Sequence, residues 1–588
     1  MKTTRIGLLL LSVLLCVALG VAFTACDRGD TPADTTVADT AAPTEPDTEA
    51  PTDTPTEPET TEAPTEAPTE PEETEPPIVD VPVGDTLDAP HATQFTVSNV
   101  FASDMVVQRG EFLRVWGWAD ASQNGKKVTG EFKGMFAEAI IENGAWEITF
   151  GARMEASAEL GHTMKIYADG VSYEFTDVLV GDVYMVMGQS NCAYTVHNHH
   201  LYVNTPDKGG KDVLDYNAPI RIHYNSQMQT QGYPKWGTEE VCLEVKSGST
   251  WQRADSYNDI ASFTAIGYLF AHNYVKLTDS KVPIGLIEID GNGRPIGAFM
   301  CNEVATEKGT DRFDANKGYY VTTGVNGDAG RFLYNCYMYP FERYALAGLI
   351  WYQGESDLLQ ANTRVYAENF SALMTYMRST HNLINKDFPV YYVEFPTIYQ
   401  KPANHVGDWH YMDVGLIRAA MGEIQRILPN SHQIVSTDLW SDDTFFNNLH
   451  PNCKFEQSER AAILAAAVNG EGGKTMAQGN GPILVSMEIL EGGKKAILTY
   501  ENVGEGLKTS DGGTTVKGFQ IYRKNVSLNP RAELTATITA PNQITIESNT
   551  GISGLAYNAI TYNVFGVDVN LCNSEGVPAG ATVILKED

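Results

Sequence analysis

A serine and a histidine in this 588-residue chain stand where a nucleophile and its base could act. Ser190 follows the apolar segment Val183–Met187, and Gly188, two residues before the serine, allows a close approach of backbone. A serine hydroxyl needs a neighbouring imidazole that takes its proton and later returns it. His450 is one of 12 histidines and lies in a polar stretch late in the chain. The pair indicates acyl transfer, although a lone serine at a strand end is more often a helix N-cap.

Two further polar blocks also follow apolar segments, and the first of them could stabilise a developing oxyanion. Gly293 lies in a glycine-rich run after Pro283–Ile287, and its backbone N–H could donate, although such runs are usually plain turns. Gln353 and Glu355 follow the apolar segment Leu346–Trp351. An amide and acids at that position are unusual for pure scaffold, so we expect them to line a site.

Strand-like and helix-like patterns alternate around these blocks. The expected strands are Val183–Met187, Pro283–Ile287, Leu346–Trp351, Val390–Phe395 and Ile434–Thr437, and the expected helices are Phe263–Leu277, Arg364–Arg378, Met412–Ile427 and Ser458–Val468. This alternation predicts a three-layer α/β domain with a parallel sheet over residues 181–475. In such sheets ligands bind at the carboxyl ends of the strands, where all three blocks lie.

The flanking regions show short β-like segments without a helical period. We therefore predict β-sandwich-like modules over residues 91–180 and 476–588. Asn143-Gly144 is a strong hairpin-turn signal within the first of them.

Residues 1–25 have the layout of an export signal, with Lys2 and Arg5 before an apolar run. Cys26 follows small residues, as in a bacterial lipobox, whose cysteine is lipidated. An uncleaved anchor and ordinary cleavage with release are the alternatives. We expect an exported lipoprotein that an N-terminal lipid holds at the cell surface or another extracytoplasmic membrane face.

Residues 26–90 form a Thr/Pro/Glu-rich linker that we expect to be disordered. Between residues 27 and 90 there are 19 acids, Arg28 and no aromatic residue. With +2 from residues 1–25, the net charge of −33 leaves only −17 for residues 91–588. The acidic balance argues against a nucleic-acid partner. The body's cysteines are scattered without a Cys-x-x-Cys pair, so we expect no metal and no cofactor.

Taken together, the blocks resemble the sialate O-acetylesterase family of SGNH hydrolases. The motifs that carry this resemblance are Gly188-Gln189-Ser190-Asn191, Gln353-Gly354-Glu355-Ser356 and Leu449-His450-Pro451. Further similar stretches, such as Ser103–Arg109 and Val178–Val183, extend it from about residue 96 to the end. The resemblance implies a flavodoxin-like SGNH core that removes acetyl groups from sugar hydroxyls without a metal.

The resemblance also assigns roles by position. Ser190 is expected to be the nucleophile and His450 the general base and acid. The Ser190 backbone N–H, Gly293 and the side-chain amide of Gln353 are expected to donate to the oxyanion. Asn191 and Glu355 are expected to line the site.

One departure from the family pattern concerns the residue that would orient the histidine. The superfamily has Asp three residues before the histidine, and here that residue is Asn447, which cannot supply a carboxylate. An acid-to-amide change in a triad can cost roughly 10⁴ in rate. Three alternatives remain open: Asp442 or Asp443 serves instead, a Ser–His dyad operates with a carbonyl orienting the ring, or the site is weakened.

The leading hypothesis is therefore a carbohydrate O-acetylesterase, with sialate esters as its first expected substrate and a serine acyl-enzyme intermediate. The same chemistry fits acetylated xylan or another plant polysaccharide. A non-catalytic glycan-binding lipoprotein with a degenerate esterase site is the alternative from a different class, and Asn447 motivates it.

Overall fold

The structure is a computed structural model. It describes residues 92–202, 214–224, 241–279, 282–307, 313–314, 319–320, 333–358, 360–396, 408–439, 450–523, 534–548, 558–564 and 568–585. The predicted signal, Cys26 and the linker lie outside the described residues, and so do Asp442, Asp443 and Asn447. Among the described helices, none combines the length and the apolar character that crossing a membrane requires.

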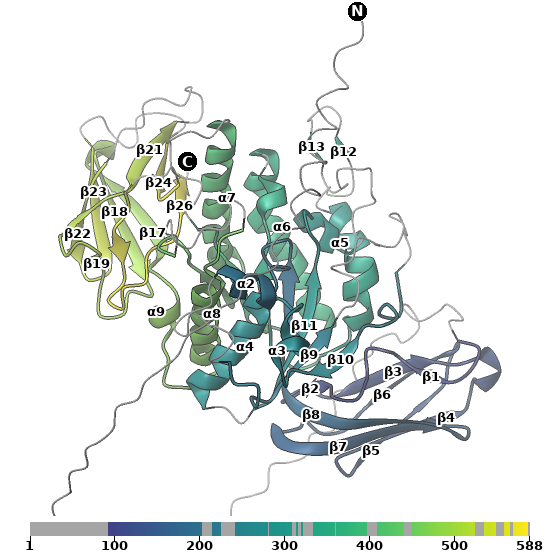
Figure 1. The fold of residues 1–588 in the computed structure, drawn as a ribbon. Coiled ribbons are helices and arrows are strands. Elements are labelled where there is room, and N and C mark those ends of the chain that lie inside the picture. The colour runs from purple at the N-terminus through teal and green to yellow at the C-terminus, as the bar shows by residue number, and fades with distance from the viewer. Residues whose placement is uncertain are drawn as a thin grey trace, which may run out of the picture. The chain divides into compact units, whose positions relative to one another are not determined.

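A mostly parallel sheet forms the centre of the α/β domain (Figure 1). Its strands, in spatial order, are β10 (Thr250–Arg253), β9 (Ile220–Tyr224), β11 (Ile284–Asp290), β8 (Val171–Gly188), β14 (Gly348–Tyr352), β15 (Val390–Val393) and β16 (Ser431–Ile434). Only β10 runs antiparallel to its neighbour in this series. Counted along the chain, β8, β11, β14, β15 and β16 have the order 2-1-3-4-5, which is the flavodoxin-like arrangement. The predicted parallel α/β sheet is confirmed, and β9 and β10 extend it at one edge.

Two helix pairs cover the two faces of this sheet. The helices are α4 (Ala265–Thr278), α6 (Gln360–Thr380), α7 (Asp408–Ile427) and α8 (Lys454–Val468), and α4 packs on α8 while α6 packs on α7. The side chain of Val186 lies against Gly267 of α4, whereas Trp351, the register partner of Met187, contacts the Phe370 ring of α6 edge to face. Because neighbouring strand residues point to opposite faces, α4 and α6 lie on opposite sides of the sheet.

Strand β8 pairs both with strands of the N-terminal β-region and with strands of the central sheet. Its first half pairs antiparallel with β7 and parallel with β2, and its second half lies between β11 and β14. The N-terminal strands are β1 (Thr96–Val97), β2 (Val106–Gln108), β3 (Arg114–Trp118), β4 (Lys127–Phe132), β5 (Met135–Ile140), β6 (Ala145–Thr149) and β7 (Ser157–Ala168). Asn143 and Gly144 have φ of 51° and 75°, which confirms the predicted hairpin turn. One continuous strand therefore crosses the boundary expected at residues 180 and 181.

The C-terminal region forms three antiparallel sheets with a separate apolar core. The strands are β17 (Ile483–Leu490), β18 (Lys495–Glu501), β19 (Lys508–Thr509), β20 (Thr515–Val516), β21 (Phe519–Arg523), β22 (Thr535–Ala540), β23 (Gln543–Glu547), β24 (Asn558–Tyr562), β25 (Leu571–Cys572) and β26 (Thr582–Leu585). The antiparallel strands confirm the β-rich character predicted here.

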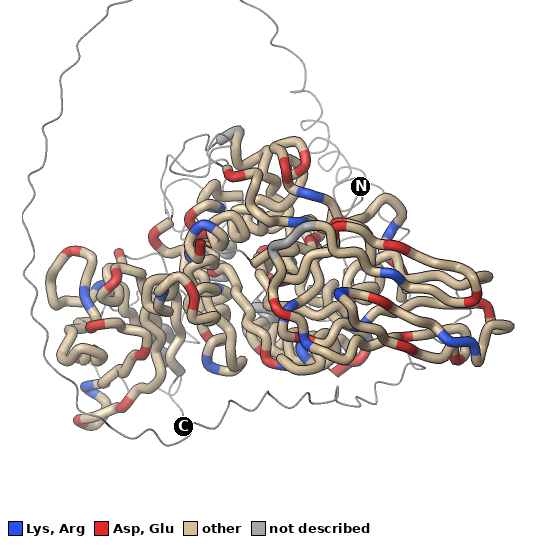
Figure 2. Tube along the Cα trace, turned by 90° about the horizontal axis from the view of Figure 1, so that it is seen from below, with Lys and Arg blue, Asp and Glu red and all other residues tan. Residues whose placement is uncertain are grey.

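The remaining elements are short. They are α2 (Val196–Tyr202), α3 (Tyr257–Ile260), α5 (Asn302–Glu307), α9 (Met476–Gly479), β12 (Phe313–Asp314), β13 (Tyr319–Tyr320), η1 (Ala121–Gln123), η4 (Ile296–Phe299), the π-helix η5 (Tyr334–Met338), η6 (Tyr339–Phe341), η7 (Glu355–Asp357) and η10 (Glu491–Gly493). Figure 2 shows acidic and basic residues interspersed along the described body, as its mild net charge predicts.

Candidate active site

The first block forms a tight turn after β8. A side chain at Gly188 would place its Cβ 2.1 Å from the carbonyl oxygen of Tyr352, so only glycine fits there. The backbone N–H groups of Cys192 and Ala193 both donate to the Gln189 carbonyl, at 2.8 and 2.9 Å, and close the turn. Ser190 is half-buried at this turn. The turn therefore holds Ser190 at the carboxyl end of the central strand, as predicted.

The second and third blocks meet the first at the same edge of the sheet. Gly188 is the register partner of Asp290 on β11 and of Tyr352 on β14. Gly293 follows β11 with φ of 67°, and a Cβ placed there would contact nothing within 4 Å. The backbone at Gly293 thus faces open space next to the strand ends. Its role as an oxyanion donor stays a prediction.

Gln353 has contacts that do not favour the role expected of it. Its side chain is fully buried, and Nε2 lies 2.6 Å from Asp357 Oδ2, 3.0 Å from the Arg294 carbonyl and 3.1 Å from Gln189 Oε1. An amide nitrogen has two protons, and three protein acceptors already surround this one. The Gln353 amide therefore links the three blocks to one another, and protein acceptors are available for both of its N–H groups.

Asp357 and Tyr366 complete this network. The Asp357 carboxylate also accepts from the backbone N–H of Ile296 at 2.8 Å, and burial raises its pKa to about 6. The Tyr366 hydroxyl, from α6, lies 2.7 Å from the Gln353 carbonyl. The network fixes the loops after β11 and β14 relative to the nucleophile turn.

His450 lies four residues before Lys454, the first residue of α8, and is half-buried. Burial, and after it the positive charge of Lys454, lower the pKa of His450 to about 4. The imidazole is therefore neutral near pH 7, which is the state that a general base requires. Asn447, Asp442 and Asp443 lie outside the described residues, so the choice between triad and dyad stays open.

Asn191 and Glu355 contact each other, and their role in lining the site stays a prediction. Asn191 is buried beside Ser190, and its Nδ2 donates to Glu355 Oε1. Burial is the main cause that raises the pKa of Glu355 to about 7.

The sequence reasoning missed Lys454. It lies in the first turn of α8 with a relative exposure of 0%, and its Nζ donates to Asn191 Oδ1 at 2.7 Å. The one signal for it in the sequence is its place, because a cation at a helix N-terminus opposes the helix dipole.

A pair of carboxyls lies beneath the nucleophile turn. Glu288 and Asp290 are buried on the same face of β11, and the charge of Asp290 adds to burial in raising the pKa of Glu288. Burial raises the pKa of both groups. The sequence patterns gave no role to either carboxyl.

The cysteines from residue 192 onward are all free thiols, with Cys242 and Cys336 closest at 3.4 Å between their Sγ atoms. Within the described stretches there is no group of three or more His, Cys, Asp or Glu side chains placed to hold a metal ion.

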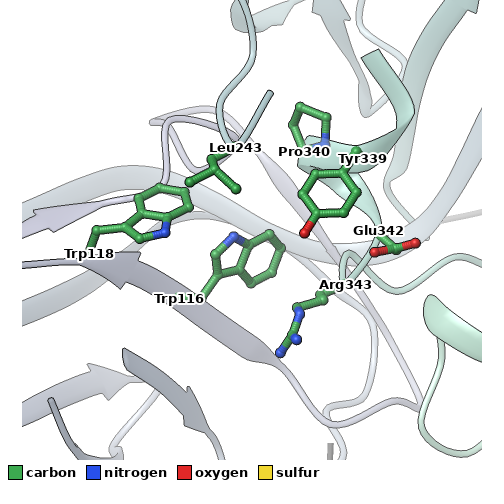
Figure 3. A pocket seen from close by; sticks show the side chains of 7 residues that line it. All are labelled: Trp116, Trp118, Leu243, Tyr339, Pro340, Glu342 and Arg343. Carbon is green, nitrogen blue, oxygen red and sulfur yellow. The ribbon is translucent and has the colours of Figure 1, made fainter. Parts of the chain in front are cut away.

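A small aromatic pocket lies elsewhere, between β3 and the segment before β14 (Figure 3). It is lined by Trp116, Trp118, Leu243, Tyr339, Pro340, Glu342 and Arg343. Arg343 is paired with Glu147 at 2.7 Å, and Glu342 accepts from Tyr334 at 2.8 Å. These residues precede β14, whereas the site follows it, so the pocket lies at the opposite edge of the sheet.

The fold and the site define the class as an α/β protein with a flavodoxin-like sheet order and a serine at the carboxyl end of its central strand. The family model described as carbohydrate esterase, sialic acid-specific acetylesterase matches residues 180–454, which include Ser190, Gly293 and His450. This match confirms the resemblance to the sialate O-acetylesterase family over the α/β domain.

Curated relatives agree with the family model. Human sialate O-acetylesterase is 27% identical over 340 residues, which cover 55% of this chain and 60% of that protein. The mouse sialate O-acetylesterase is 25% identical over 367 residues, covering 55% and 63%. The chain thus spans about three fifths of the length of these relatives. A solved carbohydrate acetylesterase from Xanthomonas citri superposes with a TM-score of 0.62 at 22% identity, over 84% of this chain and all of that one, and supports the fold.

Proposed function

We propose that this chain is a serine carbohydrate O-acetylesterase, with O-acetylated sialic acid as its first expected substrate. The observation that carries the proposal is the meeting of three strand ends, which brings the Ser190 turn, the open backbone at Gly293 and the Gln353 block to one edge of the sheet. All of them, with His450, fall within the stretch that the family model matches. The names of the curated relatives support an acetyl ester as the substrate.

In the proposed mechanism, Ser190 Oγ attacks the acetyl carbonyl carbon while His450 accepts the hydroxyl proton. The backbone N–H groups of Ser190 and Gly293 donate to the oxyanion of the tetrahedral intermediate. Collapse breaks the bond to the sugar oxygen, which takes the proton from the imidazolium and leaves acetyl-Ser190. Water then attacks the acetyl group, gives its proton to His450, and releases acetate with regeneration of the serine.

The test is acetate release from O-acetylated sialic acid and from 4-nitrophenyl acetate by the full chain. Ser190→Ala is expected to lower kcat at least 10³-fold. Ser486→Ala, an exposed serine on β17, is the matched control and is expected to keep wild-type rates. Hydrolysis by Ser190→Ala at the wild-type rate contradicts the assignment.

Two comparisons separate the alternatives. Acetylated xylan, assayed in parallel, separates a plant-polysaccharide esterase from a sialate esterase by kcat/KM. A fluorophosphonate probe separates an esterase from a degenerate glycan-binding protein, since a reactive serine forms a covalent adduct. Labelling of wild type and not of Ser190→Ala supports the enzyme, and glycan binding without labelling supports the binding protein.

We also propose the chain's organisation and location. Two β-sandwich-like modules flank the esterase domain, and an acidic linker joins it to a lipid on Cys26 at an extracytoplasmic membrane face. In a bacterial host, the full chain is expected to partition into detergent, and Cys26→Ala is expected to move it to the aqueous phase. Equal partitioning of the two proteins contradicts the anchor.

A further inference from the structure

Lys454 is a buried ammonium next to the candidate catalytic residues. Its side chain has a relative exposure of 0%, although it lies in the first turn of α8. Burial of an ammonium is unfavourable unless its charge and its N–H groups are compensated. The contacts of Lys454 therefore indicate the role of the buried cation.

Each contact of the ammonium involves a specific group. Nζ donates to Asn191 Oδ1 at 2.7 Å and to the Pro451 carbonyl at 3.1 Å. It also lies 4.5 Å from the centre of the Tyr352 ring and 5.3 Å from that of Tyr194, within cation–π range. Two hydrogen bonds and two aromatic faces thus surround the charge.

These contacts join two loops that are distant in the sequence. Asn191 follows the proposed nucleophile directly, and Pro451 follows the proposed base directly. Lys454 and Asn191 are 263 residues apart along the chain. The Nδ2 atom of Asn191 donates to Glu355, so the third block is attached to the same point. One ammonium consequently contacts both segments whose relative position governs proton transfer.

We propose that Lys454 is a positioning residue that holds the Ser190 turn and the His450 turn in register for proton transfer, an inference that rests on the proposed esterase function. Transfer of the hydroxyl proton requires the imidazole within hydrogen-bond reach, and a misplacement of about 1 Å can cost 10²-fold in rate. Lys454 acts through Asn191 and the Pro451 carbonyl.

The charge of Lys454 also acts on neighbouring titratable groups. Those around it are His450 and Cys453 beside α8, Cys192 at the nucleophile turn, Glu355 after β14, and the Tyr194 and Tyr352 rings. Burial lowers the pKa of Lys454 to about 8, and the charge of Lys454 helps to lower that of His450. Removing the cation should therefore raise the pKa of His450.

The experiment compares Lys454→Met, Lys454→Arg and the exposed control Lys494→Met in the full chain. For Lys454→Met we expect a 10- to 100-fold lower kcat and a KM within threefold of wild type. In the pH profile of kcat/KM, the acidic limb of this variant should lie at higher pH than that of wild type. Lys454→Arg keeps the charge, so its acidic limb should stay in place with an intermediate kcat. Wild-type kcat in Lys454→Met, or a lower kcat with an unmoved limb, overturns the proposal.

A second measurement tests the proposal even if Lys454→Met folds poorly. In a double-mutant cycle of Lys454→Arg with Asn191→Ala, a lysine that acts through Asn191 gives a double variant about as slow as the slower single variant, and additive losses overturn the proposal. If wild type hydrolyses no acetyl ester, the proposed function fails. The rate at which fluorophosphonate labels Ser190 still tests Lys454, because slower labelling in Lys454→Met supports its role and equal labelling refutes it.

Discussion

Arg418 and Glu394 form a fully buried ion pair, with Arg418 Nη2 3.0 Å from Glu394 Oε1. Arg418 lies on α7, and Glu394 follows β15 directly. Each residue also reaches the C-terminal region: Arg418 Nη1 donates to the Asn563 carbonyl at 3.0 Å, and Glu394 Oε1 accepts from the Ala581 N–H at 2.8 Å. The pair therefore connects the α/β domain to the C-terminal β-strands.

Breaking this pair should destabilise the chain strongly. Arg418→Leu leaves the Glu394 carboxylate buried without its cation, which typically costs about 3–5 kcal/mol of unfolding free energy. Urea denaturation monitored by circular dichroism measures this loss. Arg426→Leu on the same helix is the control, since Arg426 and Glu423 form an exposed pair at 2.9 Å. We expect that control to change stability by less than about 1 kcal/mol, and equal effects of the two variants contradict the prediction.

Gln353→Ala separates a linking role of this residue from the oxyanion role expected from the sequence. Truncation removes one donor from Asp357, which keeps the Ile296 N–H, and one from Gln189, which keeps the Ser356 N–H. Each lost hydrogen bond typically costs about 0.5–1.5 kcal/mol. We therefore expect a lower Tm together with a lower kcat. Differential scanning calorimetry and acetate release measure the two effects.

The opposite outcome for Gln353→Ala is equally specific. An oxyanion donor would lower kcat about 10²–10³-fold without a change in Tm. Gln543→Ala is the control, because that half-buried amide on β23 makes one hydrogen bond, at 3.4 Å. It should leave both Tm and kcat unchanged.

Much of the fold was predictable because burial patterns are local. The continuous apolar runs that end at Gly188 and Tyr352 are fully buried central strands. The long helices α4, α6, α7 and α8 fall close to their expected ranges. Strand β9 was missed although Ile220–Tyr224 alternates apolar residues with Arg and His, a pattern typical of a half-exposed strand. In the structure Arg221 and His223 are buried as well. The register that brings Gly188 beside both Asp290 and Tyr352 follows from the parallel order, which the alternation of elements predicts.

The candidate site was predictable in its residues and less so in their contacts. Ser190, Gly293 and Gln353 were placed at strand ends, and the structure brings those ends together. Which groups the Gln353 amide faces depends on packing between three loops, and spacing along the chain carries no information on that. Lys454 was missed for the same reason, because its partner Asn191 is 263 residues away.

The Glu288–Asp290 pair should make stability depend on pH. Burial raises the pKa of both carboxyls above their unfolded values, so the folded state binds protons more tightly than the unfolded state. The unfolding free energy should then fall as the pH rises from about 4 toward 8. Glu288→Gln removes one ionisable group, so its Tm should exceed that of wild type at pH 8 and approach it near pH 4.

Glu547→Gln, an exposed position on β23, is the control for that measurement. It should follow the wild-type Tm at each pH. A Tm difference between Glu288→Gln and wild type that is the same at every pH from 4 to 8 contradicts the prediction.

Cys242 and Cys336 should be the first thiols in the body to form a disulfide. Their sulfurs are 3.4 Å apart, and the backbone N–H of Cys242 donates to the Asn335 carbonyl at 2.8 Å, which holds the two segments together. The hydrogen bond with Cys336 lowers the pKa of Cys242 to about 7, whereas burial raises that of Cys453 to about 12. With oxidised glutathione, the Cys242 thiolate forms a mixed disulfide, and the Cys336 thiol displaces the second glutathione, so that two reduced glutathione molecules leave. Peptide mapping should find the Cys242–Cys336 bond, and Cys336→Ala should retain glutathione on Cys242. A bond between any other pair contradicts the prediction.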